Sequence, residues 1–297
     1  MRQAERGFLL LTSHLGNPER KVLSAAQMRT LAQRLRGREV PQENRALTEK
    51  DLLALGYGRE QSGQVVNLLS EEALLEHYLR RGARSGCVPV TRVSGNYPLL
   101  LRRRLGLDSP GCLWCKGDLS LLDTPAVSLV GSRDLDGPNR AFAAAVGRHA
   151  AESGLTLVSG NARGADRTAQ DACLASGGSV ISIVADELSG KQVLPNLLYI
   201  GEEDFDAPFS AQRALSRNRC IHAWGQMVYV AQAQLEKGGT WSGTVKNLRS
   251  GWSDVYGFSD GSEAMRQLEQ LGANLIATEN LRSFYDLQKS EENLFDR

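Results

Sequence analysis

Apolar residues recur every three or four positions through the first 85 residues of the chain, the spacing that predicts amphipathic helices. One such segment ends at a glycine and carries apolar side chains at Val22, Leu23, Ala26, Leu31 and Leu35. Thr48 is a suitable N-cap for a second short helix, and residues 70–82 repeat the design. The pattern predicts a small α-helical module over residues 1–85, compatible with a helix-hairpin-helix or a sterile-alpha-like bundle. Such bundles contact DNA as often as protein, and the sequence does not decide between the two.

Beyond residue 85 the pattern changes to short apolar runs that alternate with helical segments. Strands are predicted over 87–91, 112–117, 126–131, 155–160, 179–185, 227–233 and 254–258, the last of them closing the sheet. Helices are predicted over 138–154, 164–177, 216–225, 244–251 and 262–272. This alternation predicts an α/β fold with a doubly wound, Rossmann-like parallel sheet in residues 86–297.

The composition agrees with two folded domains in one chain. Of 297 residues, 41% are hydrophobic and 23% are charged, which is typical of a globular protein with a buried core. Apolar runs stay well short of the ~18 residues of a membrane span, and residues 1–16 hold too short an apolar stretch for a signal peptide. We therefore expect a cytoplasmic protein without a membrane partner.

The five cysteines, an odd number without paired spacing, fit a reducing compartment. Cys112 and Cys115 form a lone Cys-x-x-Cys, and the other three cysteines provide no second pair at zinc-ligand spacing. Alternate residues of a buried strand explain this pair, so no metal site is expected.

Positive charge is concentrated in one stretch, although the chain carries a formal net charge of only +1. Seven arginines and no acidic residue lie between Arg80 and Arg104. The stretch fits either a solvated linker surface or a positive strip that follows a polyanion, because phosphate contacts need a patch rather than a high overall charge. Both interpretations stay open.

Four polar segments are expected to meet, because ligands of such sheets bind beyond the carboxyl ends of the strands. They are Gly131-Ser132-Arg133, residues 159–167, residues 216–219 and residues 237–244. At the first of these corners, outward-pointing N–H groups and the start of a helix favour an anion, above all a phosphate.

The segment 159–167 combines backbone freedom with charge. Gly160 and Gly164 allow a sharp turn close to a ligand, and Arg163 presents a guanidinium fork to phosphate oxygens. Asp166 is expected to cap backbone N–H groups or to hold a neighbouring arginine; a capped turn without any ligand is the simpler alternative. The segment lacks a GxGxxG motif and a suitably spaced acidic residue for a ribose, which argues against a nicotinamide or flavin cofactor.

Two further segments add hydrogen-bond donors. Arg217 and Arg219 flank Asn218 at a predicted helix start, from which both arginines reach one groove, although a solvated helix start fits as well. His222 and Trp224 are candidates for base stacking or, as isolated helical aromatics more often are, for the core. A glycine-rich phosphate loop is predicted at residues 237–244, with Lys237, Gly239, Thr240 and Ser242 as its polar and flexible members.

In the order GSR, SGNARGADR, SRNR and KGGT, these segments resemble the DNA processing protein A (DprA/Smf) family. Residues 96–122 resemble its Tyr-Pro segment and following strand, and residues 269–276 its late Gly-Ala-x-x-Ile element. The resemblance implies an extended Rossmann domain in a cytoplasmic bacterial protein that binds single-stranded DNA, self-associates as a homodimer and presents the DNA to a RecA-type recombinase. The residues and the resemblance together give the candidate site Gly131, Ser132, Arg133, Gly160, Arg163, Gly164, Asp166, Arg217, Asn218, Arg219, Lys237, Gly239, Thr240 and Ser242.

The chain departs from the family pattern in several places. Gln170 stands where the family usually has a histidine, and Gln232 replaces a carboxylate at a strand end. The loop over 193–198 and the turn over 255–261 are altered, and no winged-helix segment is expected after them. A role in defence against foreign DNA or on mobile elements is therefore as open as recombinase loading.

An enzymatic alternative comes from the nucleoside-monophosphate phosphoribohydrolases, whose signature PGGxGTxxE ends in a glutamate that assists cleavage of the N-glycosidic bond. Residues 238–247 (GGTWSGTVKN) are similar, but they carry an insertion and Asn247 replaces the glutamate. An amide cannot exchange a proton as a carboxylate does, and Asp166 and Glu236 are weak substitutes. We therefore expect a binding protein without catalytic residues or a cofactor, with such a hydrolase or a nucleotide sensor as the alternatives.

Overall fold

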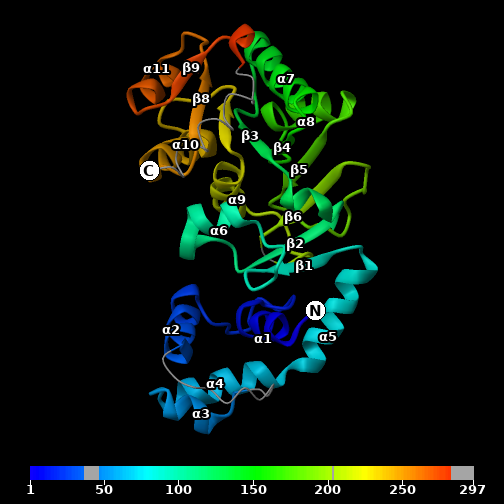
Figure 1. Cartoon of the computed structure of the whole chain (residues 1–297), viewed down its shortest axis with the longest axis vertical. Coiled ribbons are helices and arrows are strands. Elements are labelled where there is room, and N and C mark those ends of the chain that lie inside the picture. The colour runs from blue at the N-terminus through cyan, green and yellow to red at the C-terminus, as the bar shows by residue number, and fades with distance from the viewer. Residues whose placement is uncertain (37–46, 203, 282–297) are drawn as a thin grey trace, which may run out of the picture.

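The computed structural model describes residues 1–36, 47–202 and 204–281. A group of N-terminal helices lies beside one end of a long sheet, whose two faces are covered by further helices (Figure 1). The helices are α1 (Gln3–Thr12), α2 (Ala25–Arg36), α3 (Glu49–Ala54), α4 (Arg59–Ser70), α5 (Glu72–Arg84), α6 (Leu99–Leu105), α7 (Gly137–Glu152), α8 (Ala165–Ala175), α9 (Ala211–Trp224), α10 (Gly238–Ser250) and α11 (Glu263–Gln270). The strands are β1 (Val88–Thr91), β2 (Cys112–Gly117), β3 (Ala126–Val130), β4 (Thr156–Ser159), β5 (Ser179–Ile183), β6 (Leu197–Gly201), β7 (Met227–Val230), β8 (Asp254–Phe258) and β9 (Asn274–Ile276).

The strands of the described residues form one sheet in the order β1-β2-β6-β5-β4-β3-β7-β8-β9. The pairs from β6 to β9 are parallel, whereas β2 is antiparallel to β6 and β1 is antiparallel to β2. From β3 the chain builds outward to β6 on one side and then returns to add β7, β8 and β9 on the other. The predicted doubly wound sheet is confirmed, and its switch point lies at the ends of β3 and β7, where ligands of such folds bind.

Two strands correct the sequence prediction. The apolar run of β6 follows β5 directly in the sheet but was not predicted as a strand, and β9 extends the sheet beyond β8, which was expected to close it.

Apolar cores lie on both faces of the sheet, which explains why its central strands are apolar throughout. On one face, α7 and α8 bring Phe142 and Cys173 into the core that contains Leu157. On the other face, α9 and α11 bring Trp224 and Met265 into a second core together with α6 and α10. The loops at the strand ends are therefore held on both sides by packed helices.

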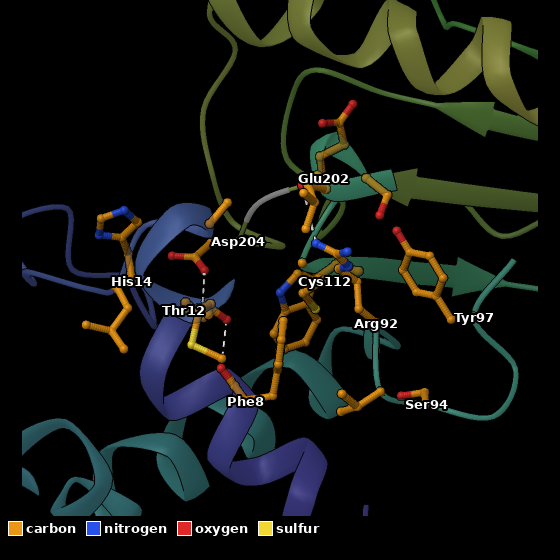
Figure 2. Close-up of a pocket in the computed structure, with 18 of the residues that line it drawn as sticks. Phe8, Thr12, His14, Arg92, Ser94, Tyr97, Cys112, Glu202 and Asp204 are labelled. Carbon is orange, nitrogen blue, oxygen red and sulfur yellow. Dashed lines mark hydrogen bonds between the residues drawn. The ribbon is translucent and has the colours of Figure 1, made fainter. Parts of the chain in front are cut away.

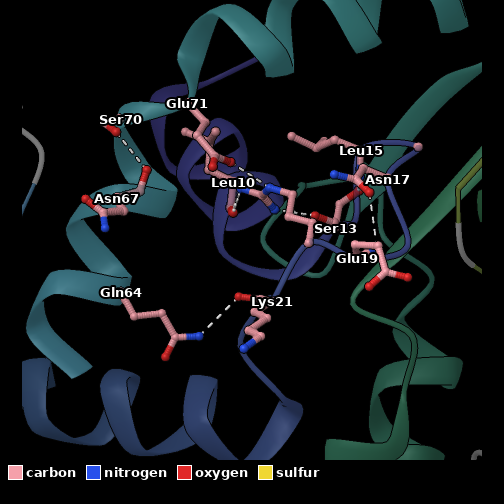
Figure 3. A network of polar contacts seen from close by, with 12 residues as sticks. Leu10, Ser13, Leu15, Asn17, Glu19, Lys21, Gln64, Asn67, Ser70 and Glu71 are labelled. Atoms are coloured by element: carbon pink, nitrogen blue, oxygen red, sulfur yellow. Dashed lines mark hydrogen bonds and ion pairs between the residues drawn. The ribbon is translucent and has the colours of Figure 1, made fainter. Parts of the chain in front are cut away.

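The N-terminal helices have a small core of their own, formed by Leu11, Leu23, Leu31, Leu52, Val65 and Leu68. Thr48 caps α3 as predicted, since its hydroxyl accepts a hydrogen bond from the amide of Asp51 at 3.3 Å. Polar contacts also join these helices (Figure 3): the buried side chain of Arg20 pairs with Glu71 at 2.7 Å and donates to the carbonyl of Leu10 in α1 at 2.6 Å. The interior of this group is thus fixed by both apolar and charged contacts.

An aromatic cluster joins the N-terminal helices to the sheet. Tyr78 of α5 packs against Trp114 of β2 and Phe205, with ring centroids 5.4 and 4.8 Å apart. Because α1 and α5 also contribute leucines to a core of the sheet, the domain boundary proposed at residues 85 and 86 stays a prediction.

Two predicted helix starts were wrong. Helix α9 begins at Ala211, capped by Ser210, so residues 216–219 lie in its second turn instead of at its start. Helix α10 begins at Gly238, so most of the predicted glycine-rich loop forms the first turns of a helix.

Candidate nucleic-acid interface

The loop after β3 is tied to the loops after β4 and β7. The Ser132 amide donates to the carbonyl of Gln232 at 2.9 Å, and the Ala165 amide donates to the carbonyl of Ser132 at 3.1 Å. A Cβ on Gly131 would lie 2.5 Å from that of Ala165, so this position requires a glycine for the close approach of α8. These contacts bring two of the four predicted segments together at the carboxyl ends of the central strands, which are called the sheet edge below.

Gly160 is the contact point for a buried ion pair. Asp166 and Arg217 are 6% and 8% exposed, and their charged atoms are 3.8 Å apart. A Cβ on Gly160 would lie 1.8 Å from Nη1 of Arg217 and 2.3 Å from Oδ2 of Asp166, so no other residue leaves room for the pair. Asp166 also accepts from the amide of Ala162 at 3.2 Å, as the proposed bracing role requires.

The same ion pair has a net electrostatic cost. Burial raises the pKa of Asp166 above its ordinary value, although Arg217 and the amide of Ala162 oppose this shift. Nε and Nη1 of Arg217 are buried without a hydrogen-bond partner in the described part of the chain. Arg217 is thus largely buried and paired with Asp166, and its predicted role in binding stays a prediction.

Arg133 and Arg163 are two of the exposed arginines of this edge; a third, Arg167, donates to the side chain of Asn161 at 2.9 Å. Arg163 is paired with Asp134 at 2.8 Å, with the two side chains 74% and 80% exposed. Gly164, the N-cap of α8, has φ of +84°, and a Cβ there would lie 2.3 Å from the carbonyl oxygen of Arg133. Arg133 and Arg163 are thus presented by neighbouring loops whose spacing depends on that glycine.

The remaining predicted residues divide between two places. Asn218 donates to the carbonyl of Gly239 at 3.1 Å, which joins α9 to the start of α10. Arg219 points elsewhere: it pairs with Glu202 at 2.7 Å and donates to the carbonyl of Asp108 at 3.0 Å. Around the start of α10, Lys237 and Ser242 are exposed and Thr240 is partly buried.

His222 and Trp224 belong to the core, at 0% and 3% exposed, so neither is available to stack on a base. Burial lowers the pKa of His222 to about 3, which keeps the imidazole neutral. Asn247, which replaces the hydrolase glutamate, is fully buried, and its side chain donates to Ser253 Oγ at 3.0 Å and accepts from the Ser253 amide at 3.1 Å. Its role is to hold the turn after α10.

Two departures from the family pattern also have structural roles. Gln232 accepts from the amide of Asp136 and donates to its carboxylate, both at 3.1 Å, an exchange that an amide can make and a carboxylate cannot. Gln170 donates to the carbonyl of Gly160 and, at 3.3 Å, to Ser182 Oγ. Both glutamines therefore hold the loops of the sheet edge.

A large cavity lies between the N-terminal helices and the segment that connects β1 to β2, and sequence reasoning did not find it. It measures about 1470 Å³, and Phe8 and His14 lie on one side with Arg92 and Tyr97 on the other (Figure 2). The arginine-rich stretch was the available signal, since Arg92 and Arg102 line this cavity.

The described residues contain no cluster of three or more histidine, cysteine or acidic side chains arranged to hold a metal ion. The five cysteines are buried and unpaired, including Cys112 and Cys115 in β2. None of the helices in the described ranges is long and apolar enough to cross a membrane.

The switch point, the tied loops and the exposed arginines define a Rossmann-like α/β protein with an anion-compatible sheet edge. A family model described as DNA recombination-mediator protein A matches residues 89–280, and the chain belongs to this family.

Individual relatives place the chain at some distance within the family. DNA processing protein DprA of Streptococcus pneumoniae is 28% identical over a match that covers 58% of this chain and 65% of the relative, just under two thirds of its length. The X-ray structure of DprA from the same species superimposes with a TM-score of 0.59 at 22% identity, covering 86% of this chain and 96% of that one. A Helicobacter pylori DprA structure, described by its single-stranded DNA binding mode, gives 0.56 at 23% identity, with 69% and 96% covered.

Proposed function

We propose that this protein binds single-stranded DNA at the sheet edge formed by the loops after β3, β4 and β7. The observation that carries the proposal is that Arg133 and Arg163 are both exposed on neighbouring loops, which are held together at Ser132 and Gly164. Exposed guanidinium groups at a helix start bind phosphate oxygens. Membership of the DNA recombination-mediator protein A family supports a polymeric rather than a mononucleotide ligand.

The same membership supports three wider parts of the proposal. The bound strand is presented to a RecA-type recombinase, the chain acts as a homodimer, and it does so in the cytoplasm. We infer a binding protein instead of an enzyme, since Asn247 is buried and committed to Ser253, so the hydrolase signature lacks its proton-exchanging group.

The test is fluorescence anisotropy with labelled oligo(dT) at several salt concentrations. We expect affinity to fall steeply with salt, and Arg133→Ala and Arg163→Ala each to weaken binding by about five- to tenfold and to lower the salt slope by roughly one contact. Arg148→Ala, on the exposed surface of α7, is the matched control and is expected to bind as the wild type does.

The absence of salt-dependent binding, or unchanged binding by both edge variants, would contradict the proposal. Release of free base from a nucleoside monophosphate would support the hydrolase instead. Tight mononucleotide binding without turnover would support a nucleotide sensor.

A further inference from the structure

Two adjoining cavities lie between the predicted-site residues of α9 and α10 and the N-terminal helices. The smaller, about 660 Å³, lies among α9, α10 and residues 107–111 after α6, and is lined by Asn218, Arg219 and Ser242 of the predicted site. The larger is the 1470 Å³ cavity between α2 and the segment containing α6 (Figure 2). Ala25, Leu107 and Glu202 line both, so the two form one continuous groove.

The groove has an excess of positive charge. Among the described residues, eight arginine and lysine side chains and four carboxylates line the two cavities. Three of these carboxylates have partners: Glu202 pairs with Arg219, and Asp206 with Arg81, each at 2.7 Å. Asp204 accepts from the Gly16 amide at 2.8 Å and Ser13 Oγ at 2.9 Å, and burial raises its pKa.

Four of the groove arginines have no carboxylate partner within the described ranges. Arg29 and Arg36 project from the exposed face of α2. Arg92 is held by carbonyl oxygens, those of Gly106 at 3.0 Å and Leu107 at 3.3 Å, and Arg102 donates to the carbonyl of Arg92. Hydrogen bonds to neutral carbonyls fix a guanidinium group without neutralising it, so its charge is retained for a ligand and less ordering entropy is lost on binding.

Exposed apolar side chains border the same groove. Leu99, Leu107 and Val93 are 67%, 41% and 40% exposed, and Met28 faces the larger cavity from α2. A single strand offers both a charged backbone and unpaired base faces, which fit guanidinium groups beside apolar surface. Duplex DNA keeps its base faces stacked and has no such match.

We infer that the groove binds a second stretch of the same single strand, which passes from the sheet edge along α9 and α10 and between α6 and α2. The inference rests on the proposed function and deepens it, because it adds a second binding surface for the strand and states the path that the strand takes away from the sheet edge. The occupied length then exceeds that of an edge-only site, and the N-terminal helices form one wall of the path.

The test compares oligo(dT) of ~6 nucleotides, near the short end of the ~4–16 of typical single-strand sites, with oligo(dT) of ~24 nucleotides, longer than all of them. The double variant Arg29→Glu/Arg36→Glu changes two exposed side chains that make no hydrogen bond or ion pair in the described structure. It is expected to bind the long oligonucleotide about tenfold more weakly, with a lower salt slope, and to bind the short one as the wild type does. Arg92→Ala, on the opposite wall, is expected to show the same length dependence.

The control is Arg80→Glu/Arg148→Glu, which makes the same change of net charge at exposed positions outside both cavities. The inference is overturned if this control matches the groove variants, if long and short oligonucleotides are affected equally, or if neither is affected. A groove that binds an acidic amphipathic peptide while the variants bind long oligonucleotides normally would be a protein-docking groove, which also overturns it. Failure of the edge variants Arg133→Ala and Arg163→Ala to weaken the short oligonucleotide would instead count against the proposed function.

Discussion

The sheet edge and the groove both present arginines, but the partners of those arginines differ. Three arginines of the predicted site, Arg163, Arg217 and Arg219, each face a carboxylate, and two of these pairs are largely buried. Arg219 also lines the groove, where its charge is balanced by Glu202. In the groove, Arg29 and Arg92 face none among the described residues. Arginines that belong to a recognisable motif are thus largely occupied in holding loops and helices together. Arginines outside the motifs keep more charge available for a polyanion.

The largest expected effect would test the structural role of the edge. Asp166→Ala leaves the Arg217 guanidinium buried and uncompensated, and we expect a loss of about 3 kcal/mol in the free energy of unfolding, measured by urea denaturation. Arg133→Ala, on the exposed side of the same edge, is expected to change it by less than about 0.5 kcal/mol.

The control for this prediction is Asp166→Ala combined with Arg217→Met, which removes both charges and should recover part of the loss. Equal stability of Asp166→Ala and the wild type would show that the pair does not hold the edge, and the contrast with the groove would disappear.

The intermediate effect is on the pH dependence of stability and comes from His222, which is buried in α9. The pKa of His222 is about 3 in the folded chain and near 6.5 when unfolded, so the unfolded state takes up a proton first as the pH falls. Stability is therefore present above pH 6.5 and lost below it, by about 1.4 kcal/mol between roughly pH 7.5 and 5.5. Chemical denaturation at these two pH values measures the loss.

The phenylalanine in His222→Phe cannot titrate. The free energy of unfolding of this variant should therefore fall by about 1.4 kcal/mol less than that of the wild type over the same pH range. Burial raises the pKa values of Asp166 and Asp204, so their folded forms take up protons first as the pH falls. These two groups therefore add stability on acidification, at pH values near their own pKa. A variant with unchanged pH sensitivity would assign the loss to other groups.

The smallest expected effect comes from removing a carboxylate at the sheet edge, so that Arg163 lacks an acidic partner as the groove arginines do. Asp134→Asn removes the charge that pairs with exposed Arg163, and stability should change by less than about 1 kcal/mol because the pair is in solvent. Single-stranded DNA binding should strengthen by about two- to fivefold, since the phosphate no longer competes with a carboxylate for Arg163. Weaker binding by this variant in anisotropy titrations would show that Asp134 positions Arg163 and does not compete for it.

Local signals predicted the elements that local chemistry controls. Thr48 caps α3, Pro138 lies in the first turn of α7, and β2 has the predicted bounds of residues 112–117. The alternation of apolar runs with glycine-ended helical segments also predicted the doubly wound sheet, and therefore that the loops after β3 and β4 would meet.

What the sequence did not predict depends on contacts between distant segments. Glycines near residue 240 suggested a loop, but they lie in α10 because α9 packs closely there: a Cβ on Gly239 would lie 2.8 Å from Asn218, and one on Gly243 2.9 Å from His222. Likewise, the pairing of Arg219 with Glu202 and the groove beside α2 need the tertiary fold, since their residues are far apart in the chain.

Residues 204–206 carry two carboxylates that connect the sheet to the N-terminal helices. Asp204 accepts from Ser13 and Gly16, and Asp206 accepts from the Tyr78 hydroxyl at 2.7 Å. A chain shortened to begin at β1 would uncover Trp114 and Phe205 and leave both acidic groups without these donors. Such a fragment would tend to aggregate and would carry added negative charge beside the arginines, so its weak DNA binding would report the damage and not the contribution of the missing helices.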